Sequence, residues 1–145
     1  MFKKLSNNQL MPNIPNSIAV TQGIKIEVSP EYIPEQSEPD ENKFTFAYQV
    51  IITNEGGSWA KLVSRHWVII DAEGNREDVE GPGVVGYTPE LSPGESFEYT
   101  SFCTLNTQWG TMEGEFNMVR ENGEKFDAEI NRFYLVFPAL VSSEL

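Results

Sequence analysis

The sequence predicts an all-β protein, a sandwich of about seven strands. From Gly23 onward, apolar residues alternate with polar ones, and this period of two is typical of strands with one buried face. Short stretches rich in glycine, proline and asparagine interrupt the alternation at intervals typical of a β-sandwich. No stretch of the sequence carries the apolar stripe of an amphipathic helix.

Two strands are predicted in the first third of the chain. One alternates over residues 24–28, and an acidic loop, "EQSEPDENK", follows it. The other lies in "KFTFAYQVIIT", where five residues share one face: Phe44, Phe46, Tyr48, Val50 and Ile52. So long an alternation predicts a half-buried strand, and "TNEGGS" ends it with turn-forming residues.

The strand predicted over residues 59–70 is apolar on both sides. Trp67 and Ile69 point to one side of it, whereas Val68 and Ile70 point to the other. In a two-layer sandwich, each strand turns one face to the core and the other to solvent. We therefore expect one apolar pair to lie outside the core and to mark a contact surface, unless the N-terminal residues or the loop at 81–87 cover it.

Three more strands are predicted in the second half of the chain, over residues 97–103, 112–118 and 126–137. The last of these changes phase between its two inward-facing sets: Phe126, Ala128 and Ile130, then Phe133, Leu135 and Phe137. A change of phase by one residue predicts a β-bulge near Asn131-Arg132.

Length and composition indicate one domain. The 145 residues are 39% hydrophobic, enough for a core without stabilising cross-links. We expect residues 1–17, which are polar and contain two prolines, to form a flexible arm, and residues 18–145 to form the sandwich. The single cysteine, Cys103, excludes an intramolecular disulfide and indicates a reducing compartment. Neither a membrane-spanning apolar run nor a secretory signal is recognisable, so we expect a cytoplasmic protein.

The chain carries a net charge of −12. Binding to a nucleic-acid backbone requires a clustered basic surface, so this charge argues against a nucleic-acid partner. We expect weak association of divalent cations but no dedicated cation site, because no acidic stretch has the ligand spacing of an EF-hand. Our main interpretation is that the acidic surface keeps a small protein in solution.

The single histidine and the single cysteine predict neither a metal site nor a nucleophile. Transition-metal sites usually gather several such ligands. We expect His66 to be a half-buried structural histidine and Cys103 to be a small core residue. No catalytic motif is recognisable either, so the sequence predicts no enzyme, no catalytic residue and no cofactor.

The stretch "EGPGVVGYTP" carries Gly81, Gly83 and Gly86 at the G-x-G-x-x-G spacing of a dinucleotide-binding loop. In such a loop the glycines lead into a helix whose N-terminus binds pyrophosphate. Here "YTPELSPG" follows, which holds two prolines and leads into a strand, and acidic residues flank the stretch. We therefore expect residues 81–87, called the glycine loop below, to form a tight crossing between sheets rather than a phosphate site.

A series of motifs in this chain resembles the ApaG family, also called DUF525 domains. The series begins with "FTFAYQVIITNEG" and continues with Trp67, Ile69 and Asp71, then "VEGPGVVGYTPELSPGESFEYTS", "GTMEGEFNM", Phe126 and "FYLVFPAL". The resemblance spans residues 21–141 and implies an immunoglobulin-like or fibronectin-III-like sandwich. Bacterial members are labelled as proteins of cobalt and magnesium efflux. Related domains in F-box and DNA-polymerase-interacting proteins imply an adaptor role, and the family offers no catalytic residues to carry over.

From these observations we expect a non-enzymatic protein-interaction module, linked only indirectly, through the resemblance, to cobalt and magnesium homeostasis. Its candidate contact surface combines the glycine loop with the neighbouring strand: Gly81, Gly83, Val84, Val85, Gly86, Tyr87, Trp67 and Ile69. The sequence identifies no partner, and homodimerisation is one form of the expected contact. Two hypotheses compete with this one: a nucleotide-binding protein or enzyme that uses the glycine loop on dinucleoside polyphosphates, and a metal carrier whose carboxylates converge in the fold.

Overall fold

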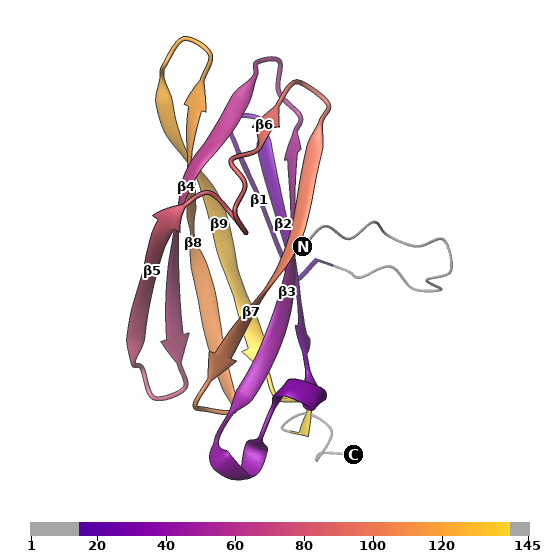
Figure 1. Ribbon diagram of the computed structural model, residues 1–145, viewed down its shortest axis with the longest axis vertical. Coiled ribbons are helices and arrows are strands. Elements are labelled where there is room, and N and C mark those ends of the chain that lie inside the picture. The colour runs from indigo at the N-terminus through magenta and orange to yellow at the C-terminus, as the bar shows by residue number, and fades with distance from the viewer. Residues whose placement is uncertain (1–14, 140–145) are drawn as a thin grey trace, which may run out of the picture.

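Two antiparallel sheets packed face to face make up the protein (Figure 1). The computed structural model describes residues 15–139. One sheet has the strand order β1-β2-β3-β7, and the other has the order β5-β4-β8-β9, with the short strand β6 also paired to β4. The predicted all-β sandwich is confirmed and is consistent with an immunoglobulin-like or fibronectin-III-like fold, although the described residues form nine strands rather than about seven.

All strands except β6 are at least five residues long. Their bounds are β1 Ser17–Thr21, β2 Ile24–Tyr32, β3 Phe44–Asn54, β4 Ala60–Asp71, β5 Arg76–Pro82, β6 Glu90–Leu91, β7 Ser96–Leu105, β8 Trp109–Arg120 and β9 Lys125–Val136. Two 3-10 helices, η1 Pro34–Gln36 and η2 Pro39–Glu41, lie in the acidic loop between β2 and β3. Strand β1 begins within the predicted arm, of which residues 1–14 lie outside the described part of the chain. No helix among residues 15–139 combines the length and the apolar character needed to cross a membrane.

Trp67 lies in the core between the sheets and is 2% exposed. Three aromatic rings surround it at centroid distances of 5.3, 6.0 and 5.9 Å: Tyr48, Phe116 and Phe133. Ile69 packs against the same cluster, so both residues face inward. Because neighbouring side chains of a strand point to opposite faces, Val68 and Ile70 lie on the outer face of the β5-β4-β8-β9 sheet. They are the apolar pair that was expected outside the core.

The predicted β-bulge is confirmed in β9. The pairing of β9 with β8 shifts by one residue between Ile130 and Phe133, so Asn131 and Arg132 together lie opposite a single residue of β8. Both Ile130 and Phe133 are buried. The extra residue therefore lets both halves of the strand turn their apolar side chains to the core.

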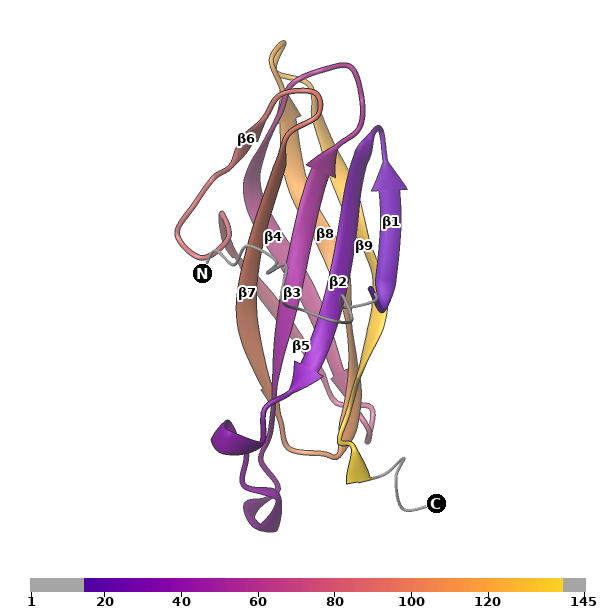
Figure 2. The same cartoon turned by 90° about the vertical axis from the view of Figure 1, so that its right-hand side faces the viewer.

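The two long sides of the sandwich differ. On one, which we call the closed side, β1 lies beside β9 (Figure 2), and side chains bridge the two strands. Ser17 Oγ donates to the carbonyl oxygen of Asn131 at 2.7 Å, Asn131 Nδ2 donates to that of Ile18 at 2.7 Å, and Thr21 Oγ1 accepts from the amide of Glu129 at 3.0 Å. On the other, which we call the open side, β5 and β7 are the edge strands, and a cleft of about 320 Å³ enters the sandwich between them.

Candidate functional site

The glycine loop connects β5 to β6 along a single edge of β4. Between the two pairings, the amide of Gly83 donates to the carbonyl oxygen of Val63 at 2.8 Å, and the amide of Leu62 donates to that of Pro89 at 2.9 Å. The loop therefore stays with one sheet, and the predicted crossing between sheets at this point is wrong. The chain crosses to the other sheet only after β6, through residues 92–95. A glycine-rich stretch predicts a tight path but does not predict which strand it follows.

A tight turn forms the tip of the glycine loop. Val84 and Tyr87 exchange two backbone hydrogen bonds, each 2.8 Å long. The two residues between them have positive φ, 42° at Val85 and 85° at Gly86, which is the pattern of a type I′ turn. Val84 is buried in the core, whereas Val85 and Tyr87 are 39% and 49% exposed.

Two glycines of the loop have close neighbours, and the contact at Gly83 excludes a side chain. A β-carbon on Gly83 would overlap the carbonyl oxygen of Tyr87, and its φ of 58° disfavours other residues. A β-carbon on Gly81 would lie 3.1 Å from the terminal nitrogens of Arg65, whose guanidinium fills that space. Arg65 Nη1 in turn donates to the carbonyl oxygens of Pro82 and Gly83, at 2.9 and 3.0 Å. The glycine spacing therefore supports a compact loop anchored by an arginine.

Several amides of the glycine loop are engaged within the protein. The amide of Gly83 bonds to β4, and those of Val84 and Tyr87 bond to each other's carbonyl groups. A phosphate-binding loop instead turns its amides, and the N-terminus of the helix that follows, toward the ligand. Here the next element is a strand, Glu90–Leu91. In this conformation these amides are not available to a phosphate group.

The predicted contact surface is smaller than expected. Trp67 is buried, and Ile69 packs against the core, so neither forms a surface with the glycine loop. Gly83 and Val84 are buried as well. The placement of Trp67 and Ile69 on a contact surface is corrected for a physical reason: when both faces of a strand are apolar, the packing of the second sheet decides which face is inward. Of the residues predicted for the contact surface, Val85, Gly86 and Tyr87 are exposed, and Gly81 is half-buried.

A hydrogen-bonded row centred on His66 crosses the outer face of the β5-β4-β8-β9 sheet. His66 Nε2 lies 2.7 Å from a carboxylate oxygen of Asp78, and Nδ1 lies 2.8 Å from one of Glu115. Arg76 Nε donates to the same Asp78 at 2.8 Å. The carboxylates of Asp78 and Glu115 raise the pKa of His66, while Arg76 and His66 lower that of Asp78. Both ring nitrogens are engaged, which confirms the prediction of a half-buried structural histidine.

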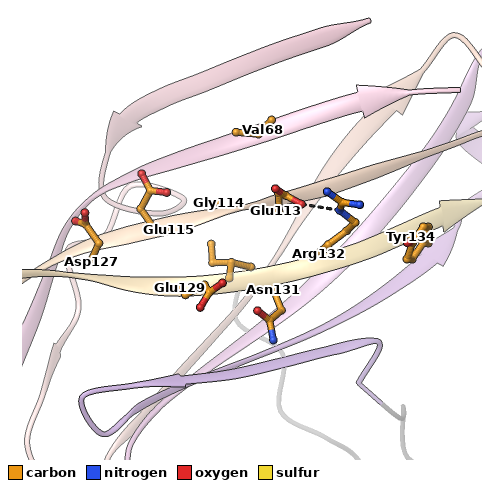
Figure 3. A pocket seen from close by; sticks show the side chains of 10 residues that line it. Val68, Glu113, Gly114, Glu115, Asp127, Glu129, Asn131, Arg132 and Tyr134 are labelled. Atoms are coloured by element: carbon orange, nitrogen blue, oxygen red, sulfur yellow. Dashed lines mark hydrogen bonds and ion pairs between the residues drawn. The ribbon is translucent and has the colours of Figure 1, made fainter. Parts of the chain in front are cut away.

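An open trough of about 830 Å³ lies on the same outer face, across β4, β8 and β9 (Figure 3). Val68 and Gly114 line it, and a β-carbon on Gly114 would overlap the carbonyl oxygen of His66. Carboxylates dominate its rim: Glu113, Glu115, Asp127 and Glu129. The cation among its lining residues is Arg132, whose Nε donates to Glu113 at 2.6 Å. Carboxylates outnumber cationic side chains here, and the expected weak association of divalent cations stays a prediction.

Cys103 is buried, as predicted for a small core residue. Burial raises the pKa of its thiol to about 11, so the thiol is protonated at neutral pH. Within residues 15–139, no group of three or more histidine, cysteine, aspartate and glutamate side chains is arranged to hold a metal ion.

Arg65, the residue that anchors the glycine loop, was not predicted from the sequence. A signal for it was present, since Arg65 alternates with Trp67 and Ile69 and therefore falls on the inward face of β4. A charged residue at such a position requires polar partners, because burying an unpaired charge is costly. Here the loop carbonyl groups supply them.

These features define a class of protein: a small all-β sandwich domain with an arginine-anchored glycine loop along one sheet edge. Residues 34–120 match the model of the ApaG domain (DUF525), and the chain therefore belongs to the ApaG family, as its motifs predicted.

Relatives of this chain cover most of its length. It is 54% identical over 122 residues to Protein ApaG of Anaeromyxobacter dehalogenans (strain 2CP-C), covering 84% of this chain and 96% of that protein. It is 49% identical over 118 residues to Protein ApaG of Ralstonia nicotianae, covering 81% of this chain and 95% of the relative. A crystal structure of a Bordetella pertussis protein described as ApaA is 46% identical, with a TM-score of 0.78, and the match covers 88% of this chain and 98% of that one.

Proposed function

We propose that this chain is a non-enzymatic interaction module that binds a protein partner through the exposed tip of the glycine loop, residues 85–87. By the same proposal, its link to cobalt and magnesium homeostasis is indirect and runs through that contact. The observation that carries the proposal is the backbone of Val85, a β-branched residue with a φ of 42°.

The conformation of Val85 is unfavourable for its residue type. A left-handed φ is rare for residues other than glycine, asparagine and aspartate, and for a β-branched residue it is an outlier. Such strain costs about 1–3 kcal/mol, persists only where the surroundings impose it, and clusters at binding sites. The side chain held in this way is 39% exposed rather than buried in the core. Strain that presents an apolar side chain to solvent supports a contact role for Val85.

The tip of the loop is also rigid. The ring of Tyr87 packs against Phe97 with centroids 5.9 Å apart, and Arg65 holds the base of the loop. A preorganised loop loses little conformational entropy when it binds. Partly exposed tyrosine beside an aliphatic side chain is typical of interface anchors.

Val85→Gly tests the proposal, because glycine keeps the type I′ turn and removes both the side chain and the strain. We expect the free energy of unfolding of this variant to equal or exceed that of the wild type. We also expect the variant to lose a partner that the wild-type chain captures from cell extract. Val20→Ser is the matched control, since Val20 is 56% exposed on β1, away from the loop, and should leave capture unchanged. Light scattering after size exclusion distinguishes a second copy of this chain from a different protein.

Equal capture by the wild type and by Val85→Gly would contradict the proposal. The competing nucleotide hypothesis predicts a different result, namely amide NMR shifts at Gly81, Gly83 and Gly86 on addition of ATP, NAD or diadenosine tetraphosphate. Shifts that saturate below about 100 μM ligand would favour that hypothesis instead. Such saturation corresponds to a binding free energy more favourable than roughly −5 kcal/mol.

A further inference from the structure

The cleft on the open side of the sandwich is distinct from the exposed tip of the glycine loop. Its volume of about 320 Å³ lies at the lower end of the range for small-molecule sites. Apolar side chains line much of it, among them Trp67, Ile69 and Met112. Arg65 and Glu77 contribute opposite charges, and they lie four residues apart in the β4-β5 register, about 13 Å along the strands.

Arg65 has hydrogen-bonding capacity that the loop does not use. Its Nη1 donates to the carbonyl oxygens of Pro82 and Gly83. Within residues 15–139, no group accepts a hydrogen bond from Nε or Nη2. The edge of a guanidinium formed by Nε and Nη2 matches the two oxygens of a carboxylate. No carboxylate of the described residues lies within ion-pair distance of Arg65, although the chain carries a net charge of −12.

Tyr99 provides a second, independent observation. Its side chain is 2% exposed, and its hydroxyl has no hydrogen-bond partner among the described residues. Its electrostatic neighbours are Tyr48 and Arg65, both of which line the cleft. Leaving a buried hydroxyl without a partner costs about 1–3 kcal/mol. Tyr99 itself does not line the cleft, so its hydroxyl reaches an acceptor oxygen of a ligand there only when the side chain turns toward Arg65 and Tyr48, and the bond gained would remove that cost.

The polar groups at this end of the cleft are donors. Burial raises the pKa of both Tyr48 and Tyr99, so both phenols keep their protons at neutral pH. The Tyr48 hydroxyl is already hydrogen-bonded to Ser101, so Arg65 and Tyr99 are the groups that call for a negatively charged acceptor on the ligand. Glu77 opposes a second negative charge farther along the cleft.

We propose that the open-side cleft binds a monocarboxylate with an apolar body. The carboxylate bonds to Nε and Nη2 of Arg65, and the apolar body lies against Trp67 and Met112. The Tyr99 hydroxyl turns toward the bound carboxylate and donates to it. Glu77 disfavours dicarboxylates and inorganic phosphate. This inference does not rest on the loop tip being a protein contact, and Val85→Gly should leave binding in the cleft unchanged.

Titration of the labelled full chain with sodium benzoate, followed by amide NMR, tests this proposal. We expect saturable shifts at Val79, Ser101 and Cys103, and none with benzamide, which has a similar shape but no charge. Succinate and inorganic phosphate should bind at least tenfold more weakly than benzoate. N-acetyl-phenylalanine identifies the source of the carboxylate: tighter binding than benzoate indicates a peptide C-terminus, and weaker binding indicates a small free acid.

Two variants test whether Arg65 and Tyr99 donate hydrogen bonds to the carboxylate. Arg65→Gln should weaken benzoate binding about tenfold or more, because a hydrogen bond to a charged group is lost. Tyr99→Phe should weaken it several-fold while the ligand-free protein becomes equally or more stable, and Tyr134→Phe, an exposed phenol on β9, is the control. Should Arg65→Gln fail to fold, Tyr99→Phe decides, since its hydroxyl has no partner to lose. Equal shifts with benzamide, or unchanged benzoate binding in Tyr99→Phe, would overturn the proposal.

Discussion

The closed and open sides of the sandwich differ in how their edge strands are connected. On the closed side, side chains of β1 bond to the backbone of β9, and the bulge at Asn131 supplies one of the carbonyl groups that they reach. On the open side, β5 and β7 leave a cleft between them, and Arg65 anchors a loop beside it. Unpaired edges invite non-specific strand pairing, so the side-chain bridges of the closed side also protect the fold.

This difference indicates that the closed side mainly stabilises the fold and that the open side holds the groups available for binding. On the closed side, Ser17, Thr21 and Asn131 bond to backbone groups of the facing strand. On the open side, the Tyr99 hydroxyl and two nitrogens of Arg65 have no hydrogen-bond partner among residues 15–139, and the backbone of Val85 is strained. Groups that remain unsatisfied or strained in the free protein are the ones that a ligand or partner can stabilise. Removal of a bonded polar side chain on the closed side should therefore lower stability, whereas removal of an unsatisfied polar group on the open side should mainly change binding.

The largest expected effect is the loss of Phe133, a fully buried residue of β9 whose ring lies 5.9 Å from Trp67 and 6.0 Å from Tyr48. Phe133→Ala should lower the free energy of unfolding by about 3–5 kcal/mol, because it leaves a cavity in the core. Tyr99→Phe, equally buried on the open side, should cost nothing. Denaturant unfolding measures the free energy of unfolding of both variants. Equal losses in the two variants would contradict the proposed difference between the two sides.

Gly83→Ala should have the next largest effect. Its β-carbon would overlap the carbonyl oxygen of Tyr87 at a φ of 58°, so the base of the loop must rearrange, at a cost of about 1–3 kcal/mol. Gly57→Ala is the control, because no atom lies within 4 Å of the added carbon and its φ is not in the left-handed region. Amide NMR shifts should be confined to the glycine loop and its neighbours. Shifts that extend to β1 and β9 would show that the two sides are coupled.

Ser17→Ala tests how much the bridge between β1 and β9 stabilises the closed side. It removes the 2.7 Å hydrogen bond to the carbonyl oxygen of Asn131 and should cost about 0.5–1.5 kcal/mol. Hydrogen exchange should become faster in β1 and remain unchanged in β7. Val20→Thr, an exposed and still β-branched change in the same strand, should leave exchange in β1 as it is.

The smallest effect is a pH dependence centred on His66. Because the carboxylates of Asp78 and Glu115 raise the pKa of His66 above its usual 6.5, the charged imidazolium is favoured in the folded protein. Its contribution to stability is fully present below about pH 6.5 and is lost as the pH rises through the higher folded-state pKa. Unfolding measured across this window should show a decline that His66→Gln removes. An NMR titration that finds the pKa of His66 at or below 6.5 would contradict this expectation.

Most of the fold could be predicted from local sequence patterns. Period-two alternation identified the long strands, and a change of phase located the bulge at Asn131-Arg132. Strand β1 was missed because its five residues turn Ser17 and Ala19 inward and Ile18 and Val20 outward, the reverse of the expected pattern. Charged residues hide β5, Arg76–Pro82, and the two residues of β6 form no recognisable pattern. The candidate site was predicted less well: the glycine loop was identified, but Trp67 was placed on its surface and Arg65 was overlooked.

By itself, the sequence determined which segments are strands and where their phase changes, because burial of alternate side chains and the steric demands of turns act between near neighbours. The tertiary structure decided that Trp67 faces inward, that Arg65 supports the glycine loop, and that the Tyr99 hydroxyl has no partner in the part of the chain that the structure describes. These facts depend on which strands of one sheet lie over which strands of the other. Residues far apart in the chain set that packing, and no local pattern contains it.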